Sequence, residues 1–180
     1  MSGVRREGER VSRTGLGPSR AGYLLAIART ELIVKAPPER VFQVLADPES
    51  YAYWVVGSKE IRDADSNWPE TGSKFHHTVG FGPISVKDHS FVEEVDPPGY
   101  LQLRVKARPM GTGRVKLIMV PVGQNQTHVT MIEDAADSLT AFVFNPLTHL
   151  LVRGRNKESL ARLAALAEGR GKPIPALNSD

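Results

Sequence analysis

The pattern of apolar and polar residues has a period of two in the middle of this chain and a helical period near its end. Between residues 100 and 108, apolar side chains alternate with polar ones, which is typical of an antiparallel strand with one face toward solvent. Turns rich in glycine and proline separate this run from others of similar character. The other predicted strands span residues 29–35, 59–63, 73–81, 84–95, 112–121 and 127–135.

The apolar pattern between Asn145 and Gly169 predicts one long amphipathic helix. Asn145 is a favourable N-cap, Pro146 suits the first helical position, and Gly169 suits a left-handed residue after the last turn. A helix of about 23 residues is about 35 Å long, enough to cover one face of a sheet. The predicted apolar stripe consists of Leu147, Leu150, Leu151, Gly154, Leu160, Leu163, Ala164 and Ala167.

Two short helices are expected between the first strand and the remaining strands. The prolines at 37–38 begin the first, and Asp47 and Pro48 begin the second. The predicted fold class is therefore α+β, with a curved antiparallel sheet of about seven strands wrapped on the long C-terminal helix. A single helix does not fill a strongly curved sheet, so we expect a cavity between them. The small helix residues expected to leave room for a ligand are Gly154, Ala161, Ala164 and Ala167.

Composition and charge exclude several classes of protein to which this chain could belong. Residues 1–28 hold five arginines and two glutamates, so the rest of the 180-residue chain holds 18 basic and 18 acidic residues. We therefore predict a basic, disordered tail over 1–28, one folded domain over 29–170, a flexible end over 171–180, and no nucleic-acid partner. The absence of cysteine excludes disulfides and thiolate metal sites and fits a cytoplasmic location. Without an apolar run of about 20 residues, stable membrane insertion is not expected.

Several short motifs, in this order, resemble the START-related helix-grip superfamily, in particular its polyketide cyclase/dehydrase-type and ligand-transport members. They are the run IVKAPPERVF at residues 33–42, DPE at 47–49, VEEVDPP at 92–98, THVT at 127–130, and the terminal amphipathic helix. The resemblance covers about residues 29–169. It implies a helix-grip fold, but the superfamily includes cyclases, hydrolases, lipid carriers and ligand sensors, so it does not select an activity.

Three polar residues are candidates for acid–base chemistry in the cavity. His77 shares the more apolar face of its strand with Phe75 and Val79, and Glu133 shares a face with Met131. Asp88 would share its face with two apolar residues, at 84 and 86. An inward histidine with an inward carboxylate could act as general acid and base in an aldol cyclisation or a dehydration. Alternatively, His77 is hydrogen-bonded in the wall, Glu133 pairs with an arginine, and Asp88 caps a turn or faces water.

Apolar and aromatic residues on the predicted inner faces are the candidate ligand contacts. The short helices would close one end of the cavity, and the hairpin at 80–83 is a second candidate gate. The predicted ligand-binding residues are Tyr53, Trp54, Phe75, Val79, Phe81, Leu103, Val105, Leu117, Met119, Val129, Met131, Leu147 and Leu151.

These patterns leave two functions open. The first is binding or transport of a small hydrophobic molecule, such as a lipid, a polyketide or a quinone-like compound, in the cavity. The alternative is a polyketide cyclase/dehydratase-type enzyme in which His77 and Glu133 form the polar pair. No metal or other cofactor is expected, because His77, Asp88 and Glu133 lack a known ligand spacing. The protein is expected to be a monomer or a homodimer.

Overall fold

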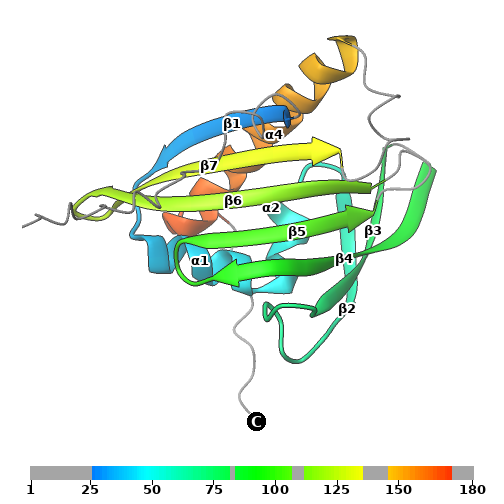
Figure 1. Ribbon diagram of the computed structural model, residues 1–180, viewed down its shortest axis with the longest axis horizontal. Coiled ribbons are helices and arrows are strands. Elements are labelled where there is room, and N and C mark those ends of the chain that lie inside the picture. Colours follow the sequence, from blue (N-terminus) through cyan, green and yellow to red (C-terminus); the bar gives the residue numbers. More distant parts are fainter. Residues whose placement is uncertain (1–25, 82–83, 107–111, 136–145, 172–180) are drawn as a thin grey trace, which may run out of the picture.

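Seven strands form one antiparallel sheet in the order β1-β7-β6-β5-β4-β3-β2 (Figure 1). The structure is a computed structural model that describes residues 26–81, 84–106, 112–135 and 146–171. From β2 to β7 each strand pairs with the next, and β7 then pairs with the first strand of the chain. The strands are β1 Ala26–Val34, β2 Ser58–Ala64, β3 Lys74–Phe81, β4 Ile84–Asp96, β5 Tyr100–Lys106, β6 Thr112–Gly123 and β7 Gln126–Ala135.

The helices lie where the proline and capping patterns predict them. They are α1 Pro38–Ala46, the 3-10 turn η2 Pro48–Ser50, α2 Tyr51–Trp54 and α4 Pro146–Ala167. The Asp47 side chain accepts a hydrogen bond of 3.0 Å from the Glu49 amide and so caps η2. Gly169 has a φ of 72°, the left-handed conformation expected after the last helical turn.

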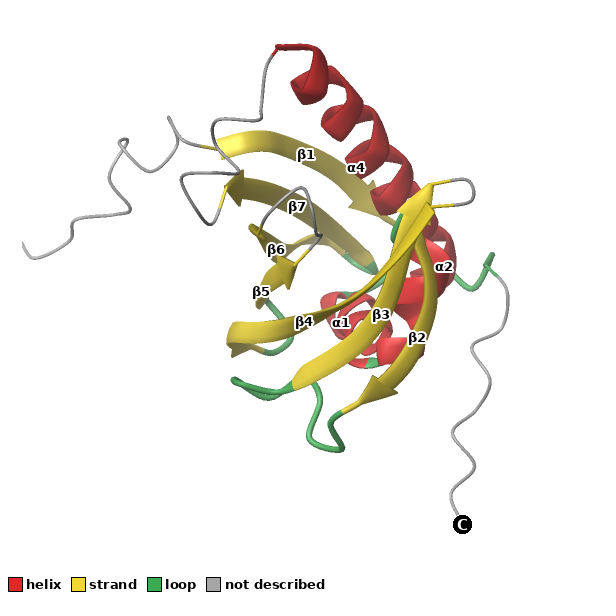
Figure 2. Cartoon of the chain, turned by 90° about the vertical axis from the view of Figure 1, so that its right-hand side faces the viewer, coloured by secondary structure: helices red, strands yellow, loops and turns green. Residues whose placement is uncertain are grey.

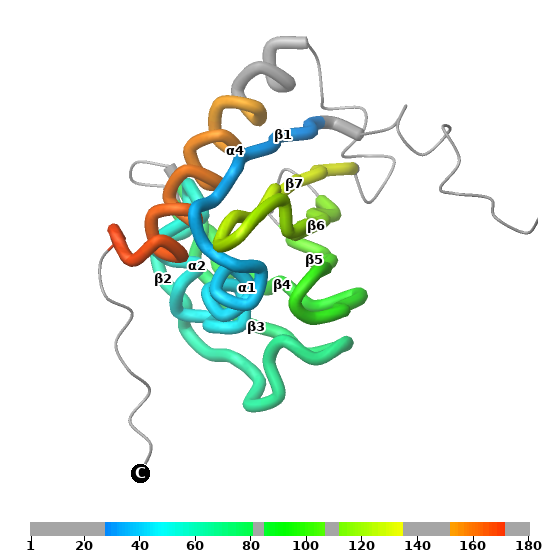
Figure 3. Tube along the Cα trace, turned by 90° about the vertical axis from the view of Figure 1, so that its left-hand side faces the viewer, coloured from blue at the N-terminus to red at the C-terminus, as the bar shows by residue number. Residues whose placement is uncertain are grey.

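The sheet curves strongly, and the helices occupy its concave side. Figure 2 shows the strands as a curved wall from β1 to β2, with α1 and α2 near one end of the enclosed space. Helix α4 packs against β1, α1 and α2, and its C-terminal end lies beside α2 in Figure 3. The predicted α+β fold, a curved antiparallel sheet wrapped on the C-terminal helix, is confirmed.

One part of the space between sheet and helix is filled with side chains. Leu160 and Leu163 of α4, Leu45 of α1, and Leu117 and Val129 of the sheet are all at most 1% exposed and belong to one core cluster. Met119, which is 3% exposed, belongs to the same cluster. Leu117, Met119 and Val129, which were predicted as ligand contacts, are therefore core residues that do not line the cavity described below.

Two details of the predicted boundaries and helix faces are wrong. Strand β1 begins at Ala26, within the segment predicted to be a tail. On α4, Gly154 and Ala161 are exposed, so they do not leave room for a ligand. Ala164 and Ala167 are buried, but in the packed core rather than at the cavity. The predicted stripe does not keep one helical face between residues 154 and 160, and the inward residues in the middle of α4 are Arg155, Asn156 and Ser159 instead.

Candidate functional site

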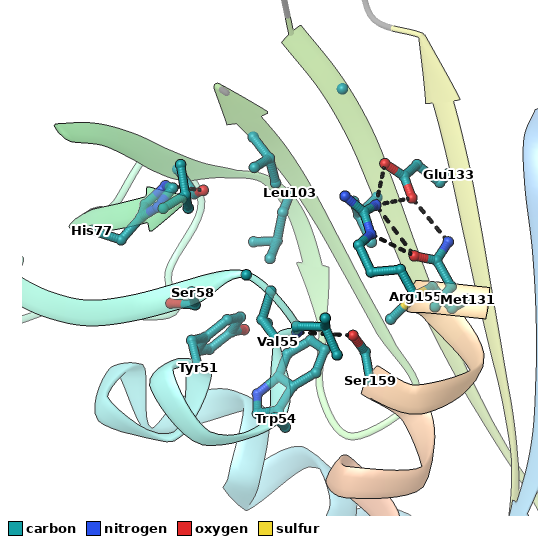
Figure 4. Close-up of a pocket in the computed structure, with 18 of the residues that line it drawn as sticks. Tyr51, Trp54, Val55, Ser58, His77, Leu103, Met131, Glu133, Arg155 and Ser159 are labelled. Atoms are coloured by element: carbon teal, nitrogen blue, oxygen red, sulfur yellow. Dashed lines mark hydrogen bonds and ion pairs between the residues drawn. The ribbon is translucent and has the colours of Figure 1, made fainter. Parts of the chain in front are cut away.

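A cavity of about 350 Å³ lies between the sheet, α2 and the middle of α4 (Figure 4). This volume is within the range of small-molecule sites, about 300–1,000 Å³. Most of its wall is apolar or aromatic, because the inward positions of the strands alternate with outward polar ones. The main apolar lining residues are Trp54, Val55, Phe75, Val79, Val86, Leu103, Val105, Val115 and Met131.

His77 is the principal polar side chain on the β3–β4 side of the cavity. It is 3% exposed, and its Nε2 atom lies 3.1 Å from the Ser90 hydroxyl, within hydrogen-bond distance. Burial lowers the pKa of His77 from 6.5 to about 4, although the charge of Asp88 and a hydrogen bond with the backbone of His89 act to raise it. The imidazole is therefore neutral at physiological pH and is hydrogen-bonded within the wall.

Asp88 lies directly opposite His77 in the antiparallel register of β3 and β4. It is 2% exposed, and its Oδ1 atom accepts a hydrogen bond of 3.0 Å from the His89 amide. Asp88 is not among the lining residues. It therefore acts on the site through the charge that it places beside His77, and it neither faces water nor caps a turn.

Glu133 lies in the cavity wall in a second polar cluster, formed by β7 and α4. The Nη2 atom of Arg155 donates to both carboxylate oxygens, at 2.8 and 2.6 Å, and Nδ2 of Asn156 donates to Oε2 at 2.9 Å. The Arg155 guanidinium also donates to Oδ1 of Asn156, at 3.3 Å from Nε and 3.2 Å from Nη2. The carboxylate is thus compensated by an arginine, the less reactive of the two arrangements that the sequence left open.

The two polar groups lie on opposite sides of the cavity. Figure 4 shows His77 on one side, the Glu133–Arg155 pair on the other, and Leu103 between them. They therefore do not form the joint acid–base pair that the sequence suggested. Each group instead has its own hydrogen-bond partners in the wall.

The structure distributes the other predicted ligand contacts unevenly. Tyr53 is 42% exposed and does not line the cavity, because it lies on the outer side of the short helix that turns Trp54 inward. The side chains of Phe81, Leu147 and Leu151, like residues 82–83 of the predicted gate, lie outside the described residues. The predicted contacts that do line the cavity are Trp54, Phe75, Val79, Leu103, Val105 and Met131.

Several lining residues were not predicted. Arg155, Asn156 and Ser159 are polar and were not among the apolar positions predicted for the inner face of the helix, although Asn156 and Ser159 lie one turn before Leu160 and Leu163. The Ser159 hydroxyl accepts a hydrogen bond of 3.1 Å from the Val56 amide and ties α4 to the segment after α2. Ser90 and His77 are 13 positions apart in the sequence, and the register between β3 and β4 brings them together. The sequence alone did not predict this contact. The available indication was that Ser90 shares a face of its strand with Val86 and Val92 by alternation.

Among the described residues, no group of three or more histidine, aspartate or glutamate side chains is arranged to hold a metal ion. No helix in the described part of the chain combines the length and apolar character needed to cross a bilayer.

A curved antiparallel sheet that wraps around a C-terminal helix and leaves a cavity beside it is the helix-grip fold. The chain belongs to the family described as polyketide cyclase/dehydrase and lipid transport, whose model matches residues 26–168. A comparison with curated proteins found no match.

Solved structures with this fold include an aromatase/cyclase. The Zhui aromatase/cyclase from a Streptomyces species is 18% identical, with a TM-score of 0.61 over 79% of this chain and 93% of that chain. A conserved protein from Geobacillus kaustophilus is 14% identical, with a TM-score of 0.62 over 78% and 94% of the two chains. A protein from Chromobacterium violaceum is 18% identical, with a TM-score of 0.59 over 78% and 96%. At these identities the similarity extends to the fold alone.

Proposed function

We propose that this protein binds a small, mainly apolar molecule in the cavity between the sheet and α4, as a carrier or binding protein. The observation that carries the proposal is the cavity of about 350 Å³, whose wall is mostly apolar. The apolar side chains of this wall lack, on the cavity side, the dispersion contacts that side chains make in a packed interior. A ligand of matching shape would replace those contacts.

The state of the polar groups favours binding over catalysis. Glu133 already accepts three hydrogen bonds from Arg155 and Asn156. His77 has a pKa near 4, and a general base is most effective when its pKa is near the working pH. Neither group is therefore tuned for proton transfer at neutral pH, whereas both can orient a ligand through hydrogen bonds.

The experiment that tests the proposal is native purification followed by solvent extraction and mass spectrometry of the extract. We expect an apolar compound in substoichiometric or stoichiometric amount, and we expect its loss from a variant in which the cavity is filled, Val105→Phe. A wild-type protein that carries no compound and binds no neutral aromatic probe added to it would contradict the proposal.

A second candidate is an enzyme of the cyclase or dehydratase type. It is favoured by one observation, the neutral His77 at the cavity with Ser90 at 3.1 Å from Nε2. In this function the Ser90 hydroxyl would release Nε2 of His77, which would take a proton from the carbon next to one carbonyl group and return it to the alkoxide oxygen formed when that carbon attacks the second carbonyl. The test is cyclisation of a soluble 1,5-diketone with wild type and His77→Gln. A rate above background that disappears in His77→Gln would favour this function over simple binding.

A further inference from the structure

The guanidinium of Arg155 is held in a fixed position and has an unused pair of donors. Its Nη2 atom is engaged by Glu133 and Asn156, and its Nε atom by Asn156. Its Nη1 atom forms no hydrogen bond with any of the described residues, and Arg155 lines the cavity. A planar guanidinium fixed on one edge presents its remaining N–H groups in a defined direction. Arg155 is thus a preorganised donor for a ligand oxygen.

The surroundings of Arg155 hold this arrangement firmly. Asn156 is 2% exposed, and it joins both ends of the pair by accepting from Arg155 and donating to Glu133. The Glu133 side chain is 13% exposed and that of Arg155 is 34% exposed. The cluster therefore forms part of the wall and costs little additional ordering when a ligand arrives.

The charge of the cluster determines which oxygen fits. Glu133 and Arg155 sum to zero, so a ligand carboxylate would gain attraction from the guanidinium and lose a similar amount to repulsion by Glu133. It would also lose its hydration on entering an apolar cavity. A neutral acceptor, such as a ketone, ester or amide carbonyl, gains the hydrogen bond without these costs.

We infer that Arg155 is the polar anchor of the ligand and that Glu133 selects its charge, so that the site takes an apolar molecule with a neutral carbonyl-type oxygen and discriminates against the matching carboxylate. This inference rests on the proposed function, and it names the chemical class of the ligand. Glu133 is in this view a specificity-determining residue. It acts through the guanidinium and has no direct role in a reaction.

The test compares three probes of nearly the same shape by isothermal titration calorimetry at neutral pH: 2-acetylnaphthalene, 2-naphthoate and 2-ethylnaphthalene. Wild type is expected to bind the ketone about tenfold more tightly than either the carboxylate or the hydrocarbon, since a hydrogen bond from a charged donor corresponds to a factor of this order. Arg155→Met is expected to reduce the affinity for the ketone to that for the hydrocarbon.

The variant Glu133→Gln tests directly whether Glu133 selects the charge of the ligand. Glutamine still accepts from Arg155 but leaves its positive charge uncompensated, so 2-naphthoate should bind about tenfold more tightly and reverse the preference. Glu158→Gln is the matched control, because Glu158 lies on the same helix in an exposed pair with Arg162. This control should leave all three affinities unchanged.

The outcomes separate this inference from the function on which it rests. Equal affinity of wild type for ketone and hydrocarbon, or an unchanged ratio of ketone to carboxylate affinity in Glu133→Gln, would overturn the assignment and leave the proposed binding function standing. If wild type bound none of the three probes, both the assignment and the binding function would be overturned.

Discussion

The middle and the C-terminal part of α4 face the same sheet but meet very different surroundings. The C-terminal part places Leu160, Leu163 and Ala164 in a core without space, whereas the middle places Arg155, Asn156 and Ser159 beside a cavity. The filled part is made of aliphatic side chains, and the hollow part has polar side chains on the helix and apolar ones on the sheet. The difference shows that one helix lines the cavity with its middle and packs into the core with its C-terminal part, and that the two stretches meet at Ser159 and Leu160.

The largest expected effect on stability comes from the filled part. Leu163→Ala removes a completely buried side chain from the core and should lower the free energy of unfolding by about 2–5 kcal/mol. Arg162→Ala, which alters the exposed neighbour paired with Glu158, should cost about 0.5 kcal/mol or less. Urea denaturation followed by circular dichroism measures both. A loss for Leu163→Ala as small as that for Arg162→Ala would contradict the assignment of the C-terminal part of α4 to the packed core.

The next largest effect is a pH dependence of stability, and it is caused by His77 in the wall of the cavity. The pKa of His77 is about 4 in the folded protein against 6.5 for an ordinary histidine, so the unfolded chain binds the proton first as pH falls. Stability should therefore decrease between pH 6.5 and 4, by about 3 kcal/mol in total from this residue, and change little from it below pH 4.

The variant His77→Gln should lose this part of the pH dependence, because glutamine does not titrate. His76→Gln is the matched control, since His76 is the adjacent residue on the same strand and is only half-buried. The measurement is urea denaturation at a series of pH values. A slope between pH 6.5 and 4 that is the same in wild type and His77→Gln would show that His77 is not responsible.

The smallest expected effect lies at the border between the two parts of α4. Ser159→Ala removes the acceptor of the Val56 amide and should lower the free energy of unfolding by about 1–2 kcal/mol. Because Val56 and Ser159 both line the cavity, the variant should also weaken binding of a neutral naphthalene probe. Thermal unfolding with and without the probe measures both effects. Unchanged ligand-induced stabilisation in Ser159→Ala would mean that this contact does not shape the site.

The comparison also explains what the sequence could and could not predict. Alternation along residues 100–108 and the caps at Asp47 and Gly169 are local features, and the strands and helices followed from them. The pairing of His77 with Ser90 depends on the β3–β4 register, which local patterns do not fix.

The middle of α4 was the main error, and it has a definite physical cause. The prediction joined the leucines at 147–151 and those at 160–163 into one inward stripe and placed Gly154 on it. The structure has the opposite arrangement, since Gly154 is exposed and Arg155 reaches Glu133. One turn before Leu160 and Leu163 lie Asn156 and Ser159, so the inward face continues into the cavity with polar residues, which a search for apolar residues does not mark.

The central claim, that the hollow part of the sheet–helix interface binds a small apolar molecule, is tested most directly by filling it. Val105 lines the cavity, whereas Val120 is 47% exposed on the outer face of the sheet, so Val105→Phe and Val120→Phe add the same atoms at contrasting places. The measurement is the Kd of 2-ethylnaphthalene for both folded variants and wild type. We expect at least about tenfold weaker binding for Val105→Phe and no change for Val120→Phe. Wild-type affinity in a folded Val105→Phe protein would contradict the account.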